Sequence, residues 1–332
     1  MTSYLSKTII CRENSNDKLS LLLNCIIDWD TFPNEIVIID SSSSKLITHD
    51  HFDRFCQLNK INLKILHKKN LYPGAARNIG IKESANSLVG FLDVLTLPHP
   101  KWLSDSLREF SDESVDGVWG YTEYQTSNRF EEIVRAATYG VLPVKTLPGS
   151  LIKKNTFSYS GLFIESTRAG EDSDWIARVN LHCLNFKDSS YPTAYSGLKG
   201  LSLVALIKKW YRNYLFGSKL PYLNAHKDIY FYAAGISLLV IAFNWNSLSY
   251  NAGMNGWDLS SPTYIPNVTK ISFALLSSLY FLVRGIYIPR LKGVPWKFLL
   301  PVNIFPLIFI SLILDVVKTF SFIKARLSSL YS

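Results

Sequence analysis

The 332-residue chain has few cysteines, and its second half has few acidic residues. The cysteines show neither a C-x-x-C pair nor the spacing of a zinc site, which excludes a disulfide framework and a zinc module. They are Cys11, Cys25, Cys56 and Cys183. We therefore expect reduced thiols in a cytosolic domain. A secretory signal peptide is not expected, because the apolar run at 7–11 is too short and leads into a polar loop.

Acidic residues are scarce after residue 198. Residues 199–332 contain 14 Lys and Arg against 3 Asp and Glu, whereas residues 1–198 contain 21 against 23. The basic half is also the apolar half of a chain whose mean hydropathy is +0.10. This combination favours contact with an anionic membrane surface. The basic residues are not interleaved with a polar face, as a nucleic-acid groove requires, so no nucleic-acid partner is expected.

Short apolar runs alternate with helical patterns in the first half of the chain. The runs predict strands at 7–11, 35–40, 62–67 and 87–93. Helices are predicted after Asn16 and over 48–59 and 75–86. Strands without polar alternation, separated by helices, indicate an α/β fold with a mostly parallel sheet covered on both faces. Such a sheet binds its ligands at the carboxyl ends of the strands.

The next part of the chain leads into a basic helix. The pattern predicts helices at 101–110, 128–139 and 171–181 and a strand at 117–124. Within 199–228, one helical face would carry Leu203, Ile207, Trp210 and Tyr214, and another Lys209, Arg212 and Asn213. A basic amphipathic helix of this kind fits the headgroup region of a membrane, although an ordinary surface helix gives the same pattern.

Charged residues are missing from 229–257. Apolar runs predict membrane spans at about 229–249 and 268–288, with Arg284 inside the second. The basic residues of 199–228 and of the Arg290–Lys297 loop place these segments in the cytoplasm, and 250–267 outside. A third apolar segment, 297–318, contains two prolines. A full crossing there would move the basic residues after it outside, so we expect this segment to re-enter or to lie in the interface.

Three stretches carry candidate functional residues. Asp40 and Asp93 each end a predicted strand, where a carboxylate can meet a ligand. For Asp40, a turn or a helix cap is an equally good interpretation. Residues 73–80 (PGAARNIG) bring backbone amides and Arg77 to a helix start, which suits a diphosphate. Residues 170–175 (GEDSDW) bring three acids to a helix start, more than capping needs, which favours a catalytic carboxylate.

In order and spacing, these stretches resemble the family 2 glycosyltransferases with a GT-A fold, over residues 7–182. KTIICREN resembles the family's first strand and loop, and EIVIIDSSSS its nucleotide-contacting strand end. GAARNIGIKESANSLVGFLD resembles its helix and metal-site strand, HPKWLSDSLREF the next helix, and TRAGEDSDWIARV its catalytic acid motif. The resemblance implies a GT-A domain at 1–198, a basic interfacial helix or linker at 199–228 and a membrane region at 229–332.

The resemblance also implies roles for individual residues. The donor, expected to be a UDP-sugar, would be bound by Arg12, Asp40, Arg77 and Asp93. Asp172, of the pair Glu171–Asp172, would be the general base that takes the proton of the attacking hydroxyl. The acceptor, or its lipid phosphate, would contact Trp175, Lys209 and Arg212.

The sequence departs from the family at residue 95. The family usually has Asp-x-Asp at this strand end, whereas this chain has Asp93 and Leu95. Donor phosphates and water could complete a Mg²⁺ or Mn²⁺ site on Asp93 alone. A metal-independent site is the alternative, and a domain that has lost its activity is another.

The expected function is that of a membrane-associated, inverting glycosyltransferase on the cytoplasmic face of a membrane. It would move a sugar from a nucleotide-sugar to a lipid-linked or membrane-held glycan acceptor. The first alternative is a polyprenyl-phosphate sugar synthase, whose acceptor is the lipid phosphate itself. The second is a catalytically inactive membrane-anchored scaffold or nucleotide-binding module. Processive polysaccharide synthesis is disfavoured, because the Gln-x-x-Arg-Trp motif is absent from the sequence.

Overall fold

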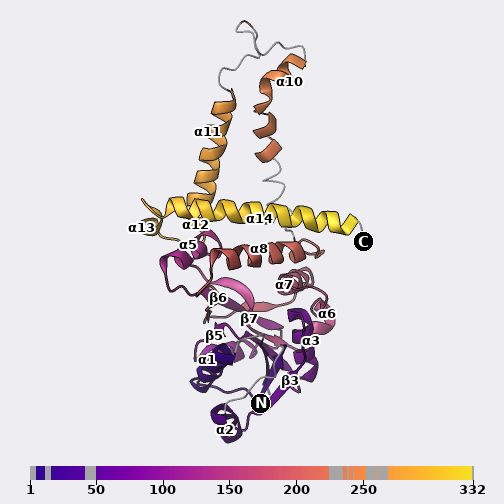
Figure 1. The fold of residues 1–332 in the computed structure, drawn as a ribbon. Helices are drawn as coiled ribbons and strands as arrows, with labels where there is room; N and C mark the ends of the chain where they lie inside the picture. Colours follow the sequence, from indigo (N-terminus) through magenta and orange to yellow (C-terminus); the bar gives the residue numbers. More distant parts are fainter. Residues whose placement is uncertain are drawn as a thin grey trace.

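The protein consists of an α/β domain followed by a set of C-terminal helices that extend away from it (Figure 1). The computed structural model describes residues 5–11, 16–41, 50–223, 235–237, 239–241, 243–251, 260 and 268–330. The α/β domain contains Asp40 and Asp93, the two strand ends at which the sequence predicts ligand binding. We describe it first, because it positions the candidate site.

One half of the central sheet is parallel, as the sequence predicts. Its strands are β1 (Leu5–Cys11), β2 (Glu35–Asp40), β3 (Asn62–His67) and β4 (Leu88–Asp93), in the order β3-β2-β1-β4. All six residues of β2 are buried, which explains its continuous apolar run. Cys11 pairs with Asp40 and Ile10 with Asp93, so the two strand-end aspartates lie at the same edge of the sheet.

The other half of the sheet is mixed, so that five of the eight described strand pairs are parallel and three are antiparallel, which agrees with a mostly parallel sheet. The strand β7 (Val144–Lys153) runs antiparallel to β4 and to β6 (Gly117–Tyr124). The short strands β8 (Phe186–Asp188) and β9 (Thr193–Tyr195) run parallel to β6, and β5 (Thr96–Leu97) pairs antiparallel with β9. The sequence pattern did not reveal β7, because Pro148 and Gly149 interrupt its apolar residues.

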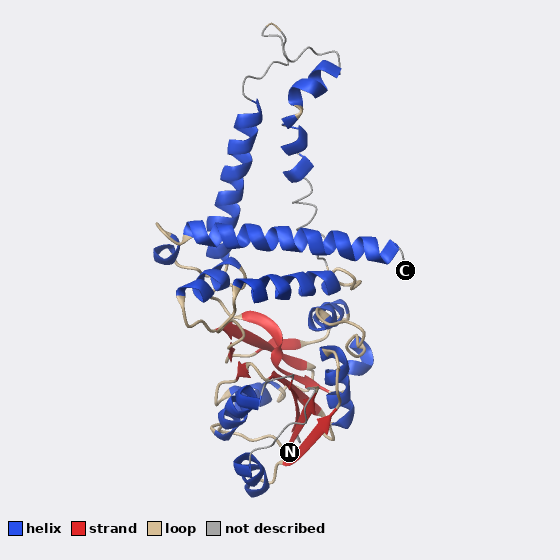
Figure 2. Ribbon diagram, viewed as in Figure 1, coloured by secondary structure: helices blue, strands red, loops and turns tan. Residues whose placement is uncertain are grey.

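Helices cover the sheet (Figure 2). The parallel half is connected by α1 (Asn16–Ile27), α2 (Asp50–Leu58) and α3 (Pro73–Glu83). The later helices are α4 (Trp102–Glu109), α5 (Arg129–Ala137), α6 (Thr156–Ser160) and α7 (Glu171–Leu181). Except for α6, which the sequence did not predict, these helices match the predicted segments to within three residues. Local chemistry explains some of their starts: the Asn128 side chain accepts a hydrogen bond from the Glu131 amide at the start of α5.

The C-terminal helices begin with α8 (Leu203–Gly217), which is shorter than the 199–228 segment expected for it. The side chain of Ser202 caps its start. The helices that follow are α10 (Trp245–Asn251), α11 (Val268–Tyr280), the π-helical turn η1 (Phe281–Tyr287), α12 (Ile288–Leu291), α13 (Trp296–Leu299) and α14 (Ile304–Leu330). The predicted span at 229–249 is described only in part, over 235–237, 239–241 and 243–249, and the predicted outer loop at 250–267 lies largely outside the described residues.

Two of the described helices are long and apolar enough to cross a membrane by length and composition. They are Ile271–Leu291, which is 11% buried, and Ile304–Ser328, which is 44% buried. The second one contacts the α/β domain through a hydrophobic cluster shared by α5, α8 and α14. Figure 1 shows α14 lying across the top of the domain, with α11 rising from it at a steep angle.

Candidate active site

A cavity of about 810 Å³ lies between the carboxyl-terminal edge of the sheet and α8. Its walls come from the end of β4, the start of α7, the strands β7 and β9, and one side of α8. Five of the predicted site residues line it: Arg77, Asp93, Glu171, Asp172 and Arg212. Segments far apart in the sequence therefore meet at the strand ends, as the α/β pattern predicts.

Arg77 joins the two acidic segments of the cavity. Its Nη1 lies 2.5 Å from Oε1 of Glu171, and its Nη2 lies 3.5 Å from Oδ1 of Asp93. The side chains of Arg77 and Glu171 are each 5% exposed. Burial by itself would lower the pKa of Arg77, but the carboxylates of Glu171 and Asp93 raise it above its usual value. Arg77 is thus a fixed cation that two carboxylates neutralise.

The loop before α7 is held against α3 by contacts that bring Glu171 to Arg77. Asn78 donates from Nδ2 to the carbonyl of Phe163 and accepts from the Phe163 amide through Oδ1. A Cβ atom at Gly74 would lie 2.1 Å from the carbonyl oxygen of Ile164, so only glycine allows this approach. This close approach gives a packing reason for glycine at residue 74, and anion binding by the backbone amides of 73–80 stays a prediction.

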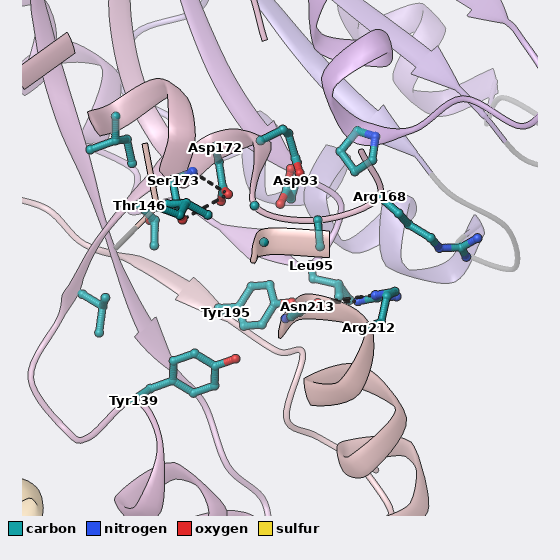
Figure 3. A pocket seen from close by; sticks show the side chains of 18 of the residues that line it. Asp93, Leu95, Tyr139, Thr146, Arg168, Asp172, Ser173, Tyr195, Arg212 and Asn213 are labelled. Atoms are coloured by element: carbon teal, nitrogen blue, oxygen red, sulfur yellow. Dashed lines mark hydrogen bonds between the residues drawn. The ribbon is translucent and has the colours of Figure 1, made fainter. Parts of the chain in front are cut away.

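Asp172 lies beside Glu171 but makes different contacts. Its Oδ1 accepts hydrogen bonds from the amide of Ser173 at 2.7 Å and from the Ser173 hydroxyl at 3.4 Å. Figure 3 shows the Asp172 side chain at the cavity with Asp93 near it. The residue before the pair, Gly170, has a φ of 89°, which places it in the left-handed region that glycine adopts readily. This turn lets two consecutive carboxylates take separate positions.

Asp93 and Leu95 belong to a tight turn between β4 and β5. The Thr96 hydroxyl donates to the carbonyl of Asp93 and accepts from its amide, which fixes the turn. The side chain of Asp93 is 36% exposed, whereas Leu95 packs partly against the main hydrophobic core. Figure 3 shows Leu95 at the cavity wall. The position of the family's second acid is therefore apolar in this chain.

The donor set at Asp93 does not fit a resident metal ion. Within the described ranges, no group of three His, Cys, Asp or Glu side chains is placed to hold one. Asp93 is a single carboxylate, and one of its oxygens faces the Arg77 guanidinium at 3.5 Å. Mg²⁺ and Mn²⁺ need several oxygen ligands, which Leu95 cannot supply. We therefore assign no step of the chemistry to a metal.

Asp40 lies at the predicted edge of the sheet but not in the cavity wall. Its side chain is fully buried, and its Oδ2 lies 2.6 Å from Nδ1 of His67, the residue beside it on β3. Arg12, the other residue expected on the nucleoside side, lies outside the described residues. Residues 42–49, which follow Asp40, are also outside them. A donor role for Asp40 and Arg12 thus remains a prediction.

Basic side chains line the other walls of the cavity, and the sequence analysis had singled out one of them, Arg212, as an acceptor contact. The set is Lys18, Lys145, Arg168 and Arg212. In Figure 3, Arg168 and Arg212 extend toward the same side. Burial, together with the charge of Arg168, lowers the pKa of Arg212. Arg168 stands three residues before Glu171 in the acid motif, and that proximity was the signal by which it could have been found.

The other two residues expected at the acceptor, Trp175 and Lys209, lie outside the cavity wall. Trp175 is fully buried in a core cluster, and its Nε1 donates to Ser160 Oγ and to the carbonyl of Gly161. A contact with an acceptor does not fit this position. Lys209 lies over the rings of Tyr139 and Tyr195, at 5.8 and 5.7 Å from their centres. Burial lowers the pKa of Lys209 to about 8.

Residues 8–164 match the family model described as "Glycosyl transferase family 2". An uncharacterized glycosyltransferase of Rickettsia felis is 30% identical over 148 residues, which cover 42% of this chain and 24% of that protein. The glycosyltransferase AglE of Haloferax volcanii is 28% identical over 175 residues, 49% of this chain and 54% of that protein. The chain thus spans about a quarter of the first relative and about half of the second.

A solved structure shares the fold over almost the whole chain. It is a mannosyltransferase of Pyrobaculum calidifontis, PcManGT, in complex with GDP-Man and Mn²⁺. The TM-score is 0.50 at 11% sequence identity, and the match covers 96% of this chain and 88% of that chain. At this identity the likeness concerns the fold alone, and it agrees with an α/β domain of the GT-A type.

Proposed function

This chain belongs to glycosyltransferase family 2, and on that premise we propose that it is an inverting enzyme that acts on a membrane-held acceptor. The sugar would come from a nucleotide-sugar and pass to a lipid-linked glycan at the cytoplasmic face. The observation that carries the proposal is that Glu171 and Asp172, although adjacent in the sequence, have different hydrogen-bond partners. Both acids line the cavity, but Glu171 is bound to Arg77, whereas Asp172 accepts hydrogen bonds from the neighbouring Ser173.

Asp172 is the general base in this proposal. It takes the proton of the acceptor hydroxyl while the hydroxyl oxygen attacks the anomeric carbon. The bond between that carbon and the nucleoside diphosphate breaks on the opposite face, so the configuration inverts in one step. The proton ends on the Asp172 carboxylate, and the electron pair leaves with the diphosphate. The cationic side chains of the cavity wall, Arg168 and Arg212 among them, stabilise the negative charge that develops there.

The membrane-held acceptor is supported by the position of α8. This helix supplies Arg212, Asn213 and Tyr214 to the cavity, and it also packs against α14. The apolar helix Ile271–Leu291 extends from the same end of the protein (Figure 1). A cavity that opens next to such helices would meet a lipid-linked substrate at high local concentration.

The test is a transfer assay with the full chain in liposomes and a panel of UDP- and GDP-sugars. We expect transfer to a lipid-linked glycan to exceed transfer to the matching soluble glycan at equal concentration. We also expect NMR of the product to show an anomeric configuration opposite to that of the donor. Equal rates with both acceptors would contradict the membrane-held acceptor, and retention of configuration would contradict the single-displacement mechanism.

A second candidate is a polyprenyl-phosphate sugar synthase, favoured by the two arginines that face one side of the cavity. Arg168 and Arg212 could hold the phosphate of a lipid acceptor, because guanidinium groups bind phosphate in a bidentate manner. With polyprenyl phosphate as acceptor, this enzyme would form a chloroform-extractable sugar phosphate. Arg212→Gln should then raise the KM for the lipid phosphate, whereas Lys219→Gln, at an exposed position outside the cavity wall, should not. Absence of such a product would exclude this candidate.

A further inference from the structure

The helix α14 presents a continuous apolar stripe to its surroundings. Seven residues on one face are between 49% and 66% exposed, and all are aliphatic or aromatic. They are Phe305, Phe309, Leu312, Val316, Phe320, Ile323 and Leu327. Their spacing of three and four residues keeps them on one side of the helix over six turns, roughly 33 Å at 1.5 Å per residue. From Phe305 to Ile323, every exposed residue of this helix is apolar.

The opposite face of α14 is the more polar one. It is mixed: Leu307, Ile310 and Leu314 are buried in the hydrophobic cluster shared with α5 and α8, and Ser311, Asp315, Lys318 and Ser321 are buried beside them. Asp315 binds Arg284 of η1, with Oδ2 at 2.9 Å from Nε, and accepts a hydrogen bond from the Tyr280 hydroxyl. A surface helix in water turns polar residues outward, whereas the exposed residues of α14 from Phe305 to Ile323 are all apolar. The stripe of α14 is therefore built for a medium less polar than water.

The orientation of α14 decides how it can meet such a medium. The helical segment Ile271–Leu291 has 21 residues, about 32 Å, which matches the hydrocarbon thickness of a bilayer. Figures 1 and 2 show α14 lying crosswise to this segment rather than alongside it. If α11 runs along the membrane normal, α14 runs close to the membrane plane.

A transmembrane position of α14 is opposed by what packs against it. Its buried face contacts α8 and α5 along much of its length. Lys318 lies over the rings of Trp210 and Tyr214 on α8, and Lys324 lies over Tyr211. If α14 crossed the bilayer, it would draw α8, with Lys208, Lys209 and Arg212, into the hydrocarbon. On scales from insertion experiments, each charged side chain at the centre of the bilayer costs roughly 2.5–3.5 kcal/mol.

We infer that α14 lies in the plane of the cytoplasmic membrane surface, with its stripe at the boundary between headgroups and acyl chains of an anionic leaflet. The inference rests on the membrane association in the proposed function and adds how the enzyme meets the bilayer. Exposed basic and aromatic residues at its two ends fit anionic headgroups: Trp296 and Lys297 precede it, and Lys324 and Arg326 lie in its last turns. The apolar segment at 297–318 thus supplies an interfacial helix and not a third crossing.

The test is a depth profile measured by electron paramagnetic resonance. Single cysteines at Phe305, Leu312, Phe320 and Leu327 carry a nitroxide, in the full chain with the exposed Cys183 replaced by serine. The protein is reconstituted into vesicles of phosphatidylcholine and phosphatidylglycerol, and collisions with oxygen and with a water-soluble nickel complex report the depth. Labels at Phe273, Leu279 and Tyr287 on the other apolar helix serve as an internal ruler. The unsubstituted parent gives the background.

We expect the four α14 labels to lie at one shallow depth, roughly 5–10 Å below the phosphates. Labels at Phe273 and Tyr287 should differ in depth by about 21 Å along the membrane normal. A depth that increases to a maximum at Leu312 or Phe320 and then falls would overturn the inference, because α14 would then cross. Water-like exposure of α14 alone would also overturn it. Water-like exposure of labels on both helices would overturn the membrane association in the proposed function as well. A failed transfer assay would contradict the proposed function alone, because the depth profile does not depend on activity.

Discussion

The Nη1 atom of Arg77 lies 2.5 Å from Oε1 of Glu171, which follows it by 94 positions in the chain. This buried ion pair connects the start of α7 to α3, and it engages the carboxylate of Glu171. The adjacent Asp172 lies at the cavity and, within the described part of the chain, accepts hydrogen bonds from Ser173. The pair therefore separates a positioning residue from a candidate base, although the two acids are neighbours in sequence.

Asp172→Asn should abolish transfer while the donor still binds. The amide has nearly the same shape but cannot take the acceptor proton, and a general base contributes about 10²- to 10⁴-fold to a rate. We expect kcat to fall by at least about 10²-fold, with the KM for the donor changed by less than about threefold. Steady-state kinetics with a saturating acceptor measures both. Asp112→Asn, at an exposed residue outside the cavity wall, is the control. Full biological activity of the Asp172 variant would instead favour the non-catalytic scaffold.

The Arg77–Glu171 pair should be a large contributor to stability when one partner is removed. Glu171→Gln or Arg77→Met leaves a buried charge with a poorer partner, which typically costs about 3–5 kcal/mol. The double variant Arg77→Met with Glu171→Met should recover most of that loss, because no buried charge remains. Urea denaturation of the detergent-solubilised chain measures the free energy of unfolding.

The surface pair between Arg129 and Glu132 provides the matched control for this effect. Its side chains are 57% and 36% exposed, at a distance of 2.9 Å. Because solvent screens an exposed pair, Glu132→Gln should change the free energy of unfolding by less than about 1 kcal/mol. If Glu171→Gln and Glu132→Gln lower the free energy of unfolding equally, burial does not strengthen the contribution of the Arg77–Glu171 pair to stability.

The first four strands and the convergence of Asp93, Arg77 and the acid pair could be predicted from the sequence. Strands buried on both faces give continuous apolar runs, and parallel strands bring their carboxyl ends to one edge. The partner of Arg77 could not be predicted, because it depends on how the loop at 163–170 packs on Gly74 and Asn78. Residues on that loop and on α3 are brought together only by tertiary contacts.

The strand β7 and the role of α14 show a different limit. Pro148 and Gly149 hide a strand that pairs on both sides, since β-propensity describes local fit and not the partners available. For α14, hydropathy reports that the helix is apolar but not which face is covered. The inverted pattern, with Asp315 inward and Phe309 outward, becomes visible only when the packing against α8 is known.

Lys209 should make the stability depend on pH in the alkaline range. Burial lowers its pKa in the folded chain to about 8, against 10.5 for an ordinary lysine. Between these values the unfolded chain binds more protons than the folded one, so the free energy of unfolding rises with pH. The full shift would correspond to about 3 kcal/mol, and the rings of Tyr139 and Tyr195 reduce it, because they favour the charged form.

The comparison with Lys209→Met isolates this contribution. From pH 8 to pH 10, the free energy of unfolding of the parent should rise by about 1–2 kcal/mol relative to that of the variant. Lys208→Met, at the exposed neighbouring position, should show no such change. A difference that stays constant with pH would mean that Lys209 keeps an ordinary affinity for its proton.

Donor binding should depend little on a divalent metal, and Leu95→Asp should create that dependence. In the parent, Asp93 is a single carboxylate with the Arg77 guanidinium 3.5 Å from one of its oxygens. We expect the cationic side chains of the cavity wall to take the place of an ion at the donor diphosphate. Calorimetric titration with UDP and with GDP should therefore give dissociation constants that agree within about threefold in Mn²⁺ and in EDTA.

A second carboxylate at residue 95 would supply the missing oxygen ligands, and Mn²⁺ should then tighten nucleotide binding by about tenfold or more, equivalent to about 1.4 kcal/mol. Leu95→Asn, of similar size but without charge, should behave like the parent. If EDTA removes nucleotide binding from the parent itself, Asp93 and the diphosphate are enough to hold the ion, and the cations of the cavity wall do not replace it.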